Sequence, residues 1–135
     1  MAGFTFRYRL SGGAPTILDL LSTDTLTVYK GDFMNLETGE LDIAATNDAA
    51  LVGAILEGGA VTDSTTRLNV IVDADAVYAV TDANARLVGA ALDITSTPGS
   101  MGVTSVTNTD FIVVAESSAS EETLVMIAPN ESWMT

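Results

Sequence analysis

The chain has 135 residues, and its 18 acidic and 5 basic side chains give a formal charge of −13 at pH 7. It has neither Cys nor His, which excludes thiolate and imidazole nucleophiles, Ser-His-Asp triads, zinc fingers and disulfide frameworks. The negative charge disfavours nucleic acid and anionic membranes as partners, and no segment reaches the roughly 20 apolar residues that span a bilayer.

Length and composition predict a single folded domain that is rich in β-structure. The chain is long enough to bury one core, but two large domains would not fit. Disordered acidic chains are poor in apolar residues, whereas 47% of this chain is hydrophobic. Abundant Ala, Val, Thr and Gly favour a β protein over a helical bundle.

The first predicted element is a strand from Phe4 to Leu10. Its residues alternate strictly, with Phe4, Phe6, Tyr8 and Leu10 on one face and Thr5, Arg7 and Arg9 on the other. Residues 11–15 follow as Ser-Gly-Gly-Ala-Pro, which is typical of a linker. Residues 16–21 fit either a helical turn or an extended apolar segment. We therefore predict an N-terminal arm and linker over residues 1–24 and a β domain over residues 25–135.

The rest of the chain predicts short strands separated by Gly or Asp turns, as in a meandering sheet, a sandwich or a barrel. No helix of three turns is expected. The predicted strands are Thr25–Tyr29, Phe33–Glu37, Leu41–Ala44, Leu51–Leu56, Leu68–Val72, Val77–Val80, Leu87–Ile94, Phe111–Ala115 and Leu124–Ala128. The Ser- and Thr-rich segment from Asp93 to Thr109 is expected to form a long surface loop or an adaptable contact loop.

Two apolar segments resemble each other at a separation of 36 residues, Ala50–Glu57 and Arg86–Asp93. Each contains a glycine inside the predicted strand, Gly53 in the first and Gly89 in the second. Such glycines permit a bulge or the close approach of another backbone, so the two could mark equivalent bends in a curled sheet. A biased composition explains the similarity equally well.

Catalysis or metal binding would have to rest on carboxylates. Asp73, Asp75, Asp82 and Asn84 could supply oxygen ligands to calcium, although Val77 occupies a ligand position of the EF-hand pattern and the required glycine is missing. Paired carboxylates of a glycosidase would need an aromatic sugar platform, for which only Tyr78 is near. We therefore predict no enzyme activity, no cofactor and no metal.

The candidate partner-binding residues lie at the two ends of the chain. Arg7 and Arg9 are two of only five positive charges, and they lie on a strand that either remains an edge strand of its own domain or adds to the sheet of a partner. Trp133 either contacts a partner or folds back onto its own core. The predicted set is Phe4, Phe6, Arg7, Tyr8, Arg9, Trp133 and Met134.

The body of the sequence resembles the capsid decoration (cement) proteins of tailed bacteriophages in the order of its strands and the placement of its turns. The similar segments are Val28–Gly39, Leu51–Glu57, Asp75–Val80, Val88–Ile94, Asp110–Ala115 and Glu122–Ile127. The resemblance implies a small β-barrel or β-tulip domain with an extended N-terminal arm, bound as a homotrimer to the outer surface of the virion. In such families an N-terminal arm often reaches a neighbouring subunit or the coat protein.

The leading hypothesis is therefore a non-enzymatic protein that stabilises the head by bridging subunits of the major capsid protein lattice. On this hypothesis, a chain that lacks residues 1–14 should fold but no longer bind heads. The alternative is a carbohydrate- or calcium-binding β module of a fibre or secreted particle. An enzyme ranks third.

Overall fold

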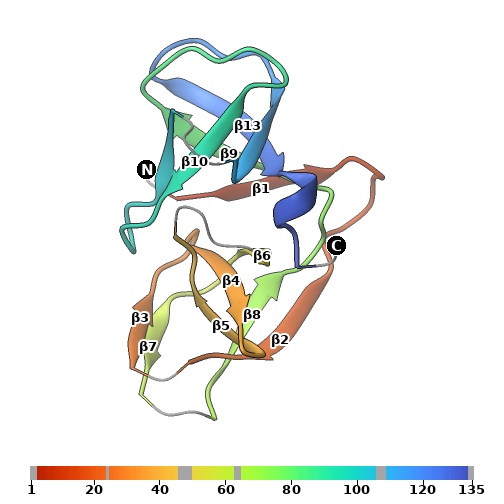
Figure 1. The fold of residues 1–135 in the computed structure, drawn as a ribbon. Coiled ribbons are helices and arrows are strands. Elements are labelled where there is room, and N and C mark those ends of the chain that lie inside the picture. The colour runs from red at the N-terminus through yellow and green to blue at the C-terminus, as the bar shows by residue number, and fades with distance from the viewer. Residues whose placement is uncertain (1–2, 24, 46–49, 63–64, 106–108, 134–135) are drawn as a thin grey trace.

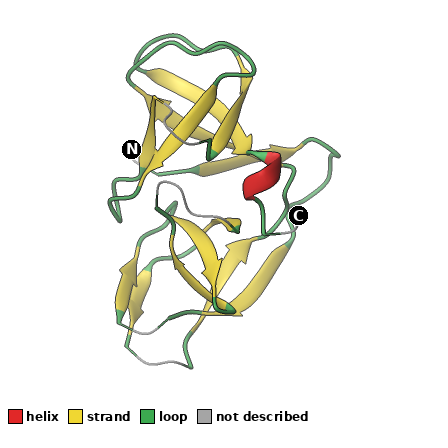
Figure 2. Cartoon of the chain, in the orientation of Figure 1, coloured by secondary structure: helices red, strands yellow, loops and turns green. Residues whose placement is uncertain are grey.

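The computed structural model describes residues 3–23, 25–45, 50–62, 65–105 and 109–133. Over these residues the chain forms thirteen strands and one short 3₁₀ turn, η1 (Pro129–Glu131). The predicted all-β class is confirmed (Figure 2). Within the same ranges, no helix is long and apolar enough to cross a membrane.

The largest sheet has six antiparallel strands in the order β1, β9, β13, β12, β10, β11. It occupies the upper half of Figure 1, with β1 along its lower border. Strand β11 also lies against β9, so the sheet curls. The bounds are β1 Thr5–Arg9, β9 Ala76–Asp82, β10 Ala91–Thr95, β11 Gly102–Ser105, β12 Phe111–Ala115 and β13 Glu121–Ile127.

The lower half of Figure 1 contains three small antiparallel sheets. In the hairpin of β4 and β5, Thr38 and Gly39 both have positive φ, 52° and 81°, as a tight two-residue turn requires. The sheets pair β2 Ile17–Leu21 with β8 Arg67–Ile71, pair β3 Leu26–Val28 with β7 Gly59–Val61, and flank β4 Phe33–Glu37 with β5 Glu40–Ile43 and β6 Leu51–Ala54.

Four aromatic residues from distant parts of the chain join the two halves. Phe33 on β4 lies with its ring centroid 5.1 Å from that of Tyr78 on β9 and 5.0 Å from that of Phe111 on β12. Phe4 packs 5.0 Å from Phe33 and 5.1 Å from Phe111. These distances are typical of favourable aromatic pairs. A second core lies within the lower half and consists of Val28, Met34, Leu41, Val52, Ile55, Val70 and Val72.

The structure corrects the predicted division at residue 24. Phe4 is only 3% exposed, β1 pairs with β9, and β2 pairs with β8. Residues 4–21 are therefore part of the folded domain, with β1 in its upper half and β2 in its lower half. Burying a phenylalanine side chain contributes roughly 1.5–3 kcal/mol, which favours this inward position over an extended arm. Of the two alternatives for this segment, the edge strand is the one that the fold contains. Residues 16–21 are extended rather than helical.

The two similar glycines have different roles. A Cβ at Gly53 would lie 1.9 Å from the carbonyl oxygen of Ile71, so this position requires the close backbone approach that the sequence suggested. Gly89 instead has a φ of 87°, a Cβ added there would meet no atom within 4 Å, and it lies in a turn before β10. The predicted strand over 87–94 therefore begins only at Ala91, and Leu87 is 70% exposed.

The segment from Asp93 to Thr109 is not one long loop. Strand β10 continues to Thr95, and β11 returns antiparallel to it over Gly102–Ser105. The Pro98-Gly99 pair lies in the connection between them, where the side chain of Tyr29 packs against Gly99. The contact loop that the sequence allowed is thus reduced, among the described residues, to a tight connection held against the β3–β4 turn.

Candidate partner interface around strand β1

A β-bulge in β1 divides its side chains differently from the alternation in the sequence. Phe6 lies opposite Tyr78, whereas Tyr8 lies opposite Val77, and the register shifts between them. Since Val77 and Tyr78 are successive residues of β9, they face opposite sides of the sheet. Phe6 therefore points inward, whereas Tyr8 points outward and is 42% exposed. The prediction that both aromatic residues share one face is wrong because of this extra residue.

An apolar groove lies on the inner side of β1, between the two halves of the domain. Its volume is about 420 Å³. Thr5 and Phe6 form one side, Leu56 and Ile71 line it from the lower half, and Lys30 is the titratable residue among its described lining. With one ammonium group and no carboxylate, this lining offers no acid–base pair for catalysis. We call this cavity the inner groove.

A shallower depression of about 410 Å³ lies around the outward-facing residues of β1. Arg7 crosses it and donates two hydrogen bonds to the carboxylate of Glu122 on β13, at 2.7 and 2.8 Å. The two side chains are 42% and 56% exposed, so solvent screens the pair and it contributes at most about 1 kcal/mol. The other lining residues are Tyr8, Ala115, Glu116 and Leu124.

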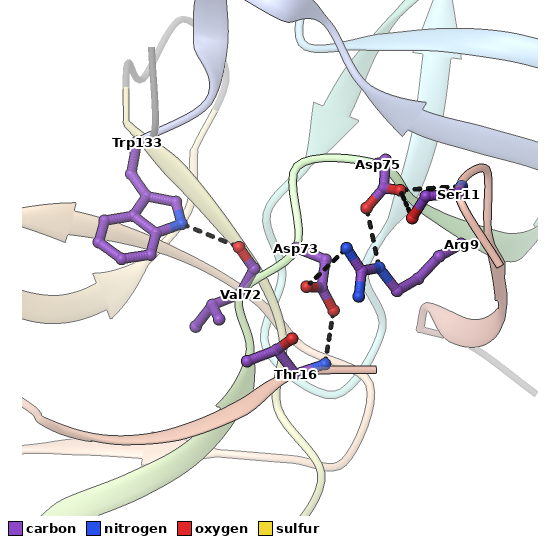
Figure 3. Close-up of polar contacts among 7 residues, drawn as sticks. All are labelled: Arg9, Ser11, Thr16, Val72, Asp73, Asp75 and Trp133. Carbon is purple, nitrogen blue, oxygen red and sulfur yellow. Dashed lines mark hydrogen bonds and ion pairs between the residues drawn. The ribbon is translucent and has the colours of Figure 1, made fainter. Parts of the chain in front are cut away.

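Arg9 closes the end of β1 onto the turn that precedes β9 (Figure 3). Its Nε donates to Asp75 Oδ1 at 3.0 Å, and its Nη2 lies 3.5 Å from Asp73 Oδ1. The backbone N–H of Ser11 donates to Asp75 Oδ2 at 3.0 Å, and that of Thr16 donates to Asp73 Oδ2 at 2.6 Å. The residues 9–16 are therefore tied to the domain by two carboxylates. We call this arrangement the Arg9 clasp.

The clasp changes the acidity of Asp75. The hydrogen bond from the Ser11 hydroxyl is the largest influence, and it lowers the pKa of Asp75 from 3.8 to about 2 with help from the Ser11 backbone and Arg9. Partial burial acts in the opposite direction. Arg9 is thus engaged within its own chain rather than free for a partner.

The C-terminal candidate Trp133 folds back onto the lower core. Its indole Nε1 donates to the carbonyl oxygen of Val72 at 3.2 Å (Figure 3). Its backbone N–H donates to the carbonyl oxygen of Leu51 at 3.0 Å. Of the two alternatives for this residue, the structure contains the internal one. Met134 lies outside the described residues. Phe4 is buried as well, so the predicted residues that remain accessible are Phe6, which lines the inner groove, and Arg7 and Tyr8, which line the outer depression.

The carboxylates considered for calcium do not form one cluster. Asp73 and Asp75 precede β9 and Asp82 ends it, which separates them by roughly 20 Å at about 3.4 Å per residue. Asp82 accepts a 2.6 Å hydrogen bond from Arg86 Nε, so its charge is compensated locally. Within the described ranges no group of three acidic side chains is placed to hold a metal ion.

Two buried polar groups serve the scaffold near the inner groove. Asp32 is fully buried and accepts backbone hydrogen bonds from Tyr29 at 2.9 Å and Gly99 at 2.8 Å, which fixes the Lys30-Gly31 turn. The Tyr78 hydroxyl accepts a hydrogen bond from the N–H of Ala54 at 3.4 Å. Burial raises the pKa of Tyr78 above its ordinary value, so the hydroxyl stays neutral.

Sequence reasoning missed the far wall of the inner groove. Leu56 and Ile71 reach β1 only through the packing of the two halves, which no local pattern encodes. Lys30 did carry a signal, because it is one of five basic residues and precedes a glycine and an acid in a predicted turn. Gly31 has a φ of 90°, which explains why glycine occupies this turn.

Comparison with known proteins gives a likeness in fold. No protein-family model matches the sequence, and no curated protein matches it either. Among solved structures, the fold is similar to that of the head fiber gp8.5 N base in bacteriophage phi29, with a TM-score of 0.53 and 16% sequence identity. The match covers 86% of this chain and 98% of that chain, so the likeness extends over nearly all of that base. At this identity it establishes a shared fold.

Proposed function

We propose that this protein is a structural component of a bacteriophage head, which binds the outer surface of the capsid and stabilises it by bridging subunits of the major capsid protein. The observation that carries the proposal is the similarity of the fold to a head fiber base over 98% of that chain. The sequence supports it independently, because a chain without Cys or His has few means of catalysis.

The proposed mechanism is linkage between binding and assembly. A protein that binds only the assembled lattice stabilises that lattice by an amount that grows with the logarithm of its concentration over its dissociation constant. A homotrimer would add to this effect, since several weak contacts on one particle reinforce each other through effective concentration. The charge of −13 would keep a densely coated particle soluble and repel DNA.

The surface around β1 is the proposed contact region. Phe6 borders the inner groove, and Arg7 and Tyr8 border the outer depression, so one strand presents residues on both of its faces. Arg7 is held by an exposed ion pair with Glu122. Because such a pair contributes little stability, a carboxylate of the partner could replace Glu122 beside Arg7 with little loss of free energy.

Co-sedimentation with heads tests the proposal. Heads of the phage that encodes the chain, purified without this protein, should carry it into the pellet in saturable amounts, whereas free coat protein should not. Coated heads should also release their DNA at a higher temperature than bare heads. Absence of saturable binding to heads would overturn the proposal. Mass measurement in solution tests the trimer separately.

A further inference from the structure

The edge of β1 that is not paired with β9 has backbone groups that face the inner groove. Phe4 donates its N–H to the carbonyl oxygen of Gly31 at 2.8 Å, on the side of the strand away from β9. Backbone groups two residues apart point to the same side of a strand, and the bulge comes only after Phe6. The N–H and C=O of Phe6 therefore also point away from β9. Neither group has a hydrogen-bond partner among the described residues.

These groups open onto apolar space. Phe6 and Thr5 line the inner groove, whose opposite wall contains Leu56 and Ile71. An unpaired strand edge is a template for another strand, and the neighbouring volume of about 420 Å³ has room for an apolar side chain of that strand. Main-chain hydrogen bonds would supply affinity, and the groove would supply specificity.

The positive charge of Lys30 at the groove indicates which kind of segment would bind there. Arg7, Arg9 and Arg86 are held in ion pairs, and Arg67 donates to the carbonyl oxygen of Asp19. Lys30 is exposed at the groove and has no such partner in the part of the chain that the structure describes. On a surface with a net charge of −13, it marks a place that attracts a carboxylate.

We infer that the inner groove accepts a short extended segment of the coat protein, which pairs with Phe6 at the edge of β1. The segment places one apolar side chain in the groove and one carboxylate beside Lys30. This inference rests on the proposed function for the identity of the partner. It reverses the role that the sequence suggested for this strand: β1 stays in its own sheet and receives a strand instead of providing one.

A pair of charge reversals tests the carboxylate contact. Overlapping synthetic peptides that cover the coat protein are titrated against the full chain by fluorescence anisotropy, and one region should bind. Lys30→Glu should weaken that binding by about tenfold or more. Arg67→Glu is the matched control, because it changes the net charge equally at an exposed site on β8 and should alter the affinity less than about twofold. Equal effects of the two variants would overturn the inference.

Backbone pairing needs its own readout. N-methylation of single peptide bonds in the bound peptide removes one donor and leaves every side chain in place, so binding should fall at alternate positions only. The amide proton of Phe6 should exchange at least about tenfold more slowly in the complex. Insensitivity to N-methylation, or unchanged exchange at Phe6, contradicts strand addition.

The two proposals fail separately. If the protein binds heads but no coat-protein peptide binds it, or if Lys30→Glu does not weaken peptide binding, the inner groove is not the acceptor site. The proposed structural role then stays intact. Absence of binding to heads overturns the proposed function, even if a peptide occupies the groove.

Discussion

Gly53 lies against Ile71 so closely that a Cβ on the glycine would be 1.9 Å from the carbonyl oxygen of Ile71 and 2.7 Å from the hydroxyl of Tyr78. This contact brings β6 and β8 together next to Tyr78, one of the aromatic residues that join the two halves. The absence of a Cβ at Gly53 thus allows β6 and β8 to approach this closely.

The first prediction uses the two similar glycines as a matched pair. Gly53→Ala should destabilise the domain by about 3 kcal/mol or more, because the backbone of β8 must move away. Gly89→Ala should cost about 1–2 kcal/mol, because only the positive φ is strained and the surrounding space is open. Urea unfolding monitored by circular dichroism measures both. Equal losses would show that the close contact at Gly53 is not rigid.

The second prediction concerns the N-terminal strand. Removal of residues 1–14 deletes β1 and exposes the edge of β9, so the truncated chain should no longer unfold cooperatively. Because such a chain gives little further information, Phe4→Ala is the more informative variant, with an expected loss of about 3–5 kcal/mol. Thr5→Ala, at an exposed position of the same strand, is the control and should change stability by less than about 0.5 kcal/mol. A truncated domain with unchanged stability would restore the arm that the sequence suggested.

The third prediction is the pH dependence of the Arg9 clasp. The pKa of Asp75 is about 2 in the folded protein against 3.8 for an ordinary aspartate, so the folded state binds the proton less readily than the unfolded state. The contribution of Asp75 to stability is therefore complete above about pH 4 and is lost as the pH falls through about 2.

Asp75→Asn tests this window. The variant should be less stable than the wild type above pH 4, and the difference should shrink between pH 4 and pH 2 because the asparagine does not titrate. Urea midpoints across that range measure the effect. Asp42→Asn serves as a control on β5, away from the clasp. A difference between Asp75→Asn and wild type that is constant with pH would contradict the clasp.

The fourth prediction separates folding from binding at the C-terminal end. Trp133→Phe keeps an aromatic ring but loses the hydrogen bond to the carbonyl oxygen of Val72, which should cost about 1–2 kcal/mol. Binding to heads should be unchanged at temperatures where both proteins are folded. Tyr8→Ala should show the reverse pattern, with stability nearly unchanged and binding weakened. Weaker binding by Trp133→Phe would instead place the C-terminal end in the interface.

Much of the strand arrangement could be predicted because it depends on local patterns. The strand over Phe33–Glu37 follows from a short apolar-rich segment between Gly and Asp turns, and the structure contains it. The fate of the N-terminal strand could not be predicted, since an edge strand and a free arm have the same alternation. The bulge at Arg7 depends on the register against β9, which is set some 70 residues later.

The candidate interface shows the same limit. Arg7 and Tyr8 were found from composition and position, and the structure leaves both open to solvent. Arg9 and Trp133 have equally conspicuous side chains, yet internal partners occupy them. Residue type alone cannot distinguish an anchor within the chain from a contact outside it. The inner groove was missed because it is formed by segments that meet only in the folded chain.

The four aromatic residues that join the two halves come from positions 4, 33, 78 and 111. During synthesis the first of them leaves the ribosome long before the last has been added. The central core therefore stays incomplete until β12 has been made, because Phe4 also packs against Phe111, which lies more than 100 residues later in the chain. Such distant contacts make folding slow. A nascent chain of this kind is exposed to aggregation until its last strands emerge, and its acidic surface gives it a means of staying dispersed during that interval.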